Sequence, residues 1–112
     1  MKRLQLFGML AGAFSALAVV SAPTQAAGDA DAGRQKTLRC LGCHGIEGYA
    51  NQYPNYRVPK IAGQHADYIV AALKAYRSGQ RSHKTMYAQA VDLSDQDIAD
   101  IAAHLARMGN KQ

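Results

Sequence analysis

The sequence predicts a small all-α domain. Apolar residues recur at helical intervals, and no segment alternates apolar and polar residues as a half-buried strand would. The chain has 112 residues, enough for one small domain, and it contains two phenylalanines and no tryptophan. Large apolar side chains are therefore scarce, and a domain of this size is marginally stable without a further stabilising element.

The first two expected helices cover residues 28–39 and 66–78. An aspartate near the start of the first suits a helix N-terminus, and Gly79 follows the second as a C-terminal cap. Residues 45–59 are expected to form a loop, because glycine, asparagine and proline recur there without periodicity.

The last expected helix has the strongest signals. Ser94 and Asp97 resemble a capping box with aspartate in place of glutamate. Gly109 marks the end of the helix. Between them runs a single apolar stripe with helical spacing, formed by Ile98, Ile101, Leu105 and Met108.

The run Cys40-Leu41-Gly42-Cys43-His44 is the most informative feature of the chain. Cysteines three positions apart lie about one helical turn from each other, which suits attachment of two vinyl groups of one porphyrin as thioethers. Cys-x-x-Cys-His is the pattern of c-type haem attachment, and it uses both cysteines of the chain. The sequence therefore predicts one covalent haem c on Cys40 and Cys43, with His44 as an axial ligand of the iron. The haem would supply the missing apolar bulk, so we expect the apoprotein to be unfolded or molten.

Two other interpretations of the cysteine pair are less favoured. A thiol redox motif is expected beside a βαβ unit, and no strand is evident in the sequence. A zinc site would need a second pair of ligands. The sequence has no further cysteine, and the other histidines lack the required spacing: His65, His83 and His104.

Met86 is favoured as the second axial ligand of the iron. It lies within residues 79–89, a polar stretch expected to be an irregular loop, where a methionine has no periodic packing role. His83 is the main alternative, because neutral imidazole also binds iron. Methionine–histidine ligation leaves no open iron position, which argues against an enzyme or gas sensor. Helix packing or capping better explains the remaining candidates: Met108, His104 and His65.

The N-terminal segment is interpreted as a signal peptide covering residues 1–26. Lys2 and Arg3 precede the charge-free apolar segment 4–20, and small residues then allow cleavage after Ala26 or one residue later. A retained anchor is less favoured, because the apolar segment falls short of the ~20 residues that usually span a membrane. Because haem is attached to this motif outside the bacterial cytoplasm, a periplasmic location is expected.

Removal of the signal would leave residues 27–112 as one monohaem domain. Loss of Lys2 and Arg3 lowers the formal net charge from +5 to +3, which is too mild to indicate nucleic-acid binding. Contact with a membrane is expected only through partner proteins or an uncleaved signal.

These features resemble the class I c-type cytochromes of bacteria, in particular the small single-haem c-553 type and its di-haem relatives. The resemblance covers essentially the whole of residues 27–112. It rests on segments that occur in the family's order: Gly28-Asp29-Ala30, Cys40 to Gly45, Pro59 to Gln64, Tyr68, Tyr76 to Arg81, Met86 and Leu93 to Ile98.

The resemblance implies a cytochrome c fold, with three to five helices packed around one covalently attached haem. It implies that the carbonyl of Pro59 accepts the second ring N–H of His44 and orients this ligand. It also implies that the first and last helices cross near Gly33.

The predicted function is periplasmic electron transfer by a monomeric carrier, not an enzyme, that docks transiently with redox partner proteins. The alternative is a haem-bearing cytochrome subunit of a larger periplasmic or membrane-associated oxidoreductase. A basic rim around the exposed haem edge is expected from four residues: Arg39, Lys60, Arg81 and Lys84.

Overall fold

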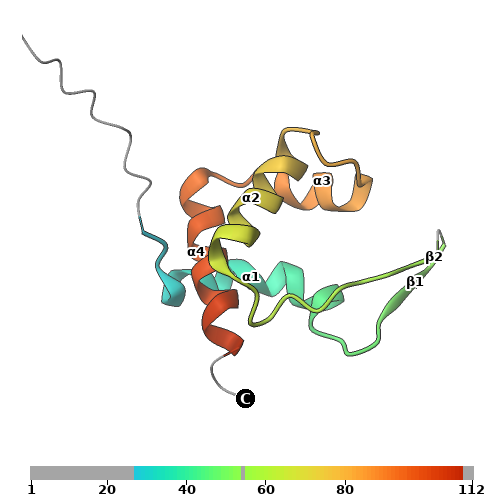
Figure 1. The fold of residues 1–112 in the computed structure, drawn as a ribbon, viewed down its shortest axis with the longest axis horizontal. Helices are drawn as coiled ribbons and strands as arrows, with labels where there is room; N and C mark the ends of the chain where they lie inside the picture. Colours follow the sequence, from blue (N-terminus) through green and yellow to red (C-terminus); the bar gives the residue numbers. More distant parts are fainter. Residues whose placement is uncertain (1–26, 54, 110–112) are drawn as a thin grey trace, which may run out of the picture.

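The computed structural model describes residues 27–53 and 55–109. The predicted signal segment, residues 1–26, lies outside the described residues. Within the described part, the fold is mostly helical, with one two-stranded antiparallel hairpin to the side of the helices (Figure 1). The elements follow in the order α1 (Ala30–His44), β1 (Ala50–Gln52), β2 (Asn55–Arg57), α2 (Ala66–Arg77), α3 (Lys84–Ala90) and α4 (Asp95–Met108). The predicted all-α class is confirmed.

Helix α1 is longer than predicted. It begins after Asp29, whose carboxylate accepts the backbone N–H groups of Asp31 and Ala32 at 2.8 and 3.2 Å. It ends at His44 and not at residue 39, so the whole cysteine–histidine run is helical. A single glycine such as Gly42 costs a helix about 1 kcal/mol, which is too little to end it there.

The hairpin corrects the expectation that residues 45–59 form only a loop. Ala50 pairs with Arg57, and Gln52 pairs with Asn55. Each strand has three residues. A period-two pattern does not emerge over so few positions, which is why no strand signal is evident in the sequence.

Helix α3 corrects the expectation that residues 79–89 are irregular. The N-cap is His83, whose ring Nδ1 accepts the backbone N–H of Met86 at 3.3 Å. Histidine is not among the preferred N-cap residues, so the sequence carried no recognisable start signal. Met86 and the fully buried Ala90 are four positions apart and therefore share the face of α3 that packs on the core.

Helices α2 and α4 agree closely with the predicted ranges. Gly79 follows α2 with a φ of 78°, in the left-handed region that glycine adopts without strain. At the start of α4, Ser94 Oγ accepts the backbone N–H of Asp97 at 3.0 Å, and Asp97 Oδ2 accepts the N–H of Ser94 at 3.0 Å. The predicted capping box is therefore present.

The apolar core lies between α2, α3 and α4. Ile98, Ile101 and Leu105 of the predicted stripe are at most 1% exposed, whereas Met108 is only partly buried at the edge of the core. Within residues 27–53 and 55–109, no helix is long and apolar enough to cross a membrane.

Helices α1 and α4 cross at Gly33, as the resemblance implied. A Cβ atom at this position would fall on the backbone carbonyl group of Asp100. Beside the crossing, the buried Thr37 hydroxyl donates a hydrogen bond to the carbonyl of Gly33 at 2.7 Å. The missing side chain therefore permits the close approach of the two helices.

A charged cluster lies against this crossing. Asp100 is only 2% exposed. Its carboxylate accepts the backbone N–H of Asp29 at 2.8 Å, the Lys36 ammonium at 2.6 Å and the Gln96 amide at 2.7 Å. Lys36 also lies 2.8 Å from Asp97. The hydrogen bonds from Lys36 lower the pKa of both carboxyl groups, and those to Asp100 and Asp97 raise the pKa of Lys36.

This cluster predicts a dependence of stability on acid. The contribution of Asp97 and Asp100 is complete above about pH 4, the ordinary pKa of an unfolded aspartate. It is lost as the pH falls through their lowered pKa values in the folded state. We expect Lys36→Met to lower the stability of the holoprotein at neutral pH and to flatten its decline in acid, measured by denaturant unfolding at several pH values. Lys74→Met is the control, because Lys74 pairs at 3.4 Å with an exposed Asp95. If the stability of Lys36→Met fell in acid as steeply as that of the parent protein, the prediction would be contradicted.

The crossing predicts opposite effects for one substitution at two glycines of α1. Gly33→Ala should destabilise the holoprotein by about 1–3 kcal/mol, because the added methyl group must push the helices apart. Gly42→Ala should be neutral or stabilising by up to about 1 kcal/mol, since a Cβ there meets no other part of the chain within 4 Å. Denaturant midpoints of the two variants, compared after confirming equal haem content, test this. Equal midpoints would count against the crossing.

Candidate haem-binding site

The two cysteines lie in the last turns of α1. Cys40 is half-buried and Cys43 is exposed, and the two do not form a disulfide with each other. Because the helix is continuous through the motif, residues three apart share one face, and both sulfur atoms project on the same side of α1. Burial raises the pKa of the Cys40 thiol. The arrangement offers two neighbouring thiols for thioether bonds to one planar group.

His44 is the final residue of α1 and contacts the loop that leaves the hairpin. Its ring Nδ1 lies 2.6 Å from the carbonyl oxygen of Pro59. A carbonyl can only accept a hydrogen bond, so Nδ1 carries the proton and the lone pair of Nε2 is free. This is the tautomer with which a histidine coordinates a metal through Nε2, while its other nitrogen is held by an acceptor.

His83 has the opposite tautomer. Because its Nδ1 accepts the backbone N–H of Met86, the proton of the neutral ring is on Nε2. Neither ring nitrogen then offers a free lone pair to a metal. Met86 itself is partly buried against the core on α3. Between these two candidates for the second axial position, the hydrogen bonding favours Met86.

The remaining candidates have positions that suit packing or capping. His104 Nδ1 lies 3.0 Å from the carbonyl of Ala30, so this ring joins α4 to the start of α1. His65 is exposed at the N-cap of α2, without a capping hydrogen bond from its side chain. Met108 packs at the edge of the core on the last turn of α4.

Tyr56 is a site residue that the sequence reasoning missed. Its hydroxyl lies 3.3 Å from the hydroxyl of Thr85 on α3, and its ring meets the ring of His83 edge-on with centroids 4.9 Å apart. Tyr56 belongs to β2, a strand that had no sequence signal, so nothing in the sequence placed it beside α3. The contact joins the hairpin to the helix that carries Met86.

One of the four expected rim charges is paired within the chain, and a second lies over an aromatic ring and keeps its charge. Arg39 pairs with Asp92 at 3.3 Å. The guanidinium of Arg81 lies over the ring of Tyr76, 4.7 Å from its centroid. The other two members are exposed: Lys60 and Lys84.

These donors fit a c-type haem. Two thiols one turn apart precede an imidazole with a free Nε2, and a partly buried thioether is available on α3. The family model described as cytochrome c matches residues 30–109. The chain belongs to the cytochrome c family. Membership implies a covalently bound c-type haem and a role in electron transfer.

Individual relatives agree with this assignment. Cytochrome c-554(548) of Halomonas halodenitrificans is 47% identical over 83 residues, which cover 70% of this chain and 94% of the relative. Cytochrome c4 of Pseudomonas aeruginosa is 43% identical over 81 residues, covering 72% of this chain and 39% of the relative. The chain thus spans nearly all of the first relative but less than half of the second.

A solved structure supports the fold. The crystal structure of reduced recombinant cytochrome c4 from Pseudomonas stutzeri superposes with a TM-score of 0.54 at 27% sequence identity. The match covers 74% of this chain and 52% of the cytochrome c4 chain. The predicted membership of the class I c-type cytochromes, related to the di-haem bacterial cytochromes c, is confirmed, as is the cytochrome c fold.

Proposed function

We propose that this cytochrome is a periplasmic electron carrier with one haem, attached to Cys40 and Cys43 and ligated by His44 and Met86. The observation that carries the ligand assignment is the pair of opposite histidine tautomers. His44 donates from Nδ1 to Pro59 and keeps Nε2 free, whereas His83 uses Nδ1 as an acceptor. The single Cys-x-x-Cys-His run in the sequence supports a count of one haem.

When bound, the haem supplies an iron that takes up and releases one electron at a time. The carbonyl of Pro59 holds the His44 ring in one orientation and makes Nε2 more electron-rich. Met86 would supply the second iron ligand, and a methionine paired with histidine would raise the reduction potential of the iron. A chain that supplied both iron ligands from His44 and Met86 would leave no open iron position for oxygen or peroxide.

The periplasmic location and transient docking belong to the same proposal. The location rests on the signal-like residues 1–26 and on haem attachment outside the cytoplasm. A monomeric carrier needs only a small docking contact, below about 1,200 Å² as in weak redox encounters. Lys60, Lys84 and Arg81 are the exposed positive charges proposed to face an acidic partner, while the charge of Arg39 is already paired with Asp92.

Substitution of the proposed methionine ligand tests the ligand set. In Met86→Ala we expect complete loss of the thioether–iron charge-transfer band of the oxidised protein and a lower reduction potential. Met108→Ala is the matched control, because this partly buried methionine packs at the edge of the core. It should keep the band. A band that survives in Met86→Ala would refute the assignment of this ligand.

Recovery of the native protein tests location and haem count together. Mass spectrometry of the periplasmic fraction should find a chain that begins near residue 27 and carries the added mass of one haem on Cys40 and Cys43. The reduced protein should bind no carbon monoxide. An exported chain without added haem would overturn the proposal. A second polypeptide present in equal amount after gentle purification would instead indicate the role of an oxidoreductase subunit.

A further inference from the structure

We propose that His83 is a positioning residue for the methionine ligand, and that it acts by capping the helical turn from which Met86 projects. The inference rests on the proposed ligation of iron by Met86. It assigns to His83 a role that involves no contact with the iron.

The capping bond acts on the backbone of the proposed ligand itself. Met86 is the third residue of α3, and its N–H is the one that the His83 ring accepts. Helix α3 has only seven residues, and a helix this short is not stable by itself. Its first turn therefore depends on the cap and on tertiary contacts. Loss of the cap would let the turn open and move the Met86 side chain.

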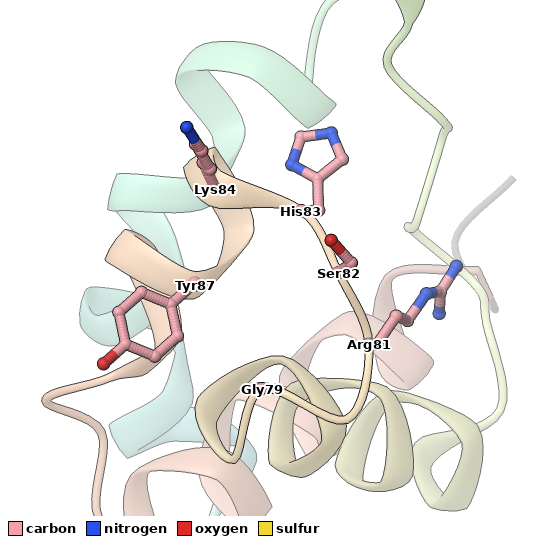
Figure 2. Close-up of a pocket in the computed structure, with 6 residues that line it drawn as sticks. All are labelled: Gly79, Arg81, Ser82, His83, Lys84 and Tyr87. Carbon is pink, nitrogen blue, oxygen red and sulfur yellow. The ribbon is translucent and has the colours of Figure 1, made fainter.

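The His83 ring contacts two tyrosines from different elements. The ring of Tyr56, on β2, lies edge-on with a centroid distance of 4.9 Å, and that of Tyr76, on α2, lies edge-on at 6.2 Å. Figure 2 shows His83 at the entry to α3, on the loop that leaves α2 after Gly79. These two contacts restrict the rotation of the ring, which keeps Nδ1 aimed at the N–H of Met86.

The short chain segment that carries Tyr56 also supports the other proposed iron ligand, His44. Tyr56 contacts His83, and Pro59, three positions later, accepts the hydrogen bond from His44. The segment from Tyr56 to Pro59 thus contacts one proposed ligand, His44, directly and contacts His83, which caps the turn that carries the other. His83 is the residue through which this segment reaches Met86.

The experiment compares three replacements of His83 in the holoprotein. His83→Phe keeps a ring but removes the acceptor, His83→Ala removes both, and His83→Asn keeps an acceptor in a residue preferred at N-caps. The readout is displacement of the methionine from oxidised iron by added imidazole, followed through the thioether–iron band. Gln89→Ala is the matched control, because it changes the last turn of α3 and leaves the cap in place.

We expect the displacement constant to rise about fivefold in His83→Phe and His83→Ala, the factor that corresponds to loss of a typical cap. His83→Asn should stay within about twofold of the parent, as should Gln89→Ala. Parent-like displacement in both His83→Phe and His83→Ala would overturn the proposal. So would a constant in His83→Asn as high as in His83→Ala, because the acceptor would then not matter.

Failure of the underlying ligand assignment gives a different result. If the parent holoprotein shows no thioether–iron band and its low-spin spectrum is lost in all three His83 variants, His83 is itself the ligand and both proposals fall. If Met86→Ala loses the band while the His83 variants behave as the parent does, Met86 remains the proposed ligand and only the positioning role is rejected.

Discussion

The close crossing of α1 and α4 is the constraint on which the rest of the structure depends. At Gly33 the backbones approach so closely that no side chain fits, and the Asp100–Lys36 cluster fills the adjacent space with paired charges. Since α1 is continuous from this crossing to His44, the crossing also determines where the last turn of α1 lies. The part of α4 that faces α1 at this crossing is the backbone of Asp100 and the side chain of His104, whereas the apolar stripe of α4 packs in the core with α2 and α3.

The second constraint is the segment from Tyr56 to Pro59. Its backbone carbonyl at Pro59 selects the tautomer of His44, and its side chain at Tyr56 contacts His83. A backbone acceptor leaves Nε2 of His44 free, and a backbone donor at Met86 makes the ring of His83 a helix cap. Two histidines of the same chemistry thus have different uses, and the difference comes from the groups they face.

The sequence predicted those elements whose signals lie within a few neighbouring residues and missed those that depend on more distant contacts or weak signals. Helices α2 and α4 were predicted closely because caps and 3.6-residue periodicity are local signals. The C-terminal part of α1, the hairpin and α3 were missed for different reasons. The end of α1 was missed because Gly42 weakens the helix signal, although the helix continues to His44. The hairpin was missed because each strand has only three residues. Helix α3 was missed because its N-cap is a histidine.

By itself the sequence determined the helical class, the Cys40–His44 run and hence the family and its covalent haem, because these depend on residue type and spacing along one helix. Only the tertiary structure decided which histidine keeps a free Nε2, which residue caps Met86 and where Tyr56 lies. Those outcomes depend on contacts between residues far apart in the chain. Such contacts are set by how helices and the hairpin pack, which local periodicity does not encode.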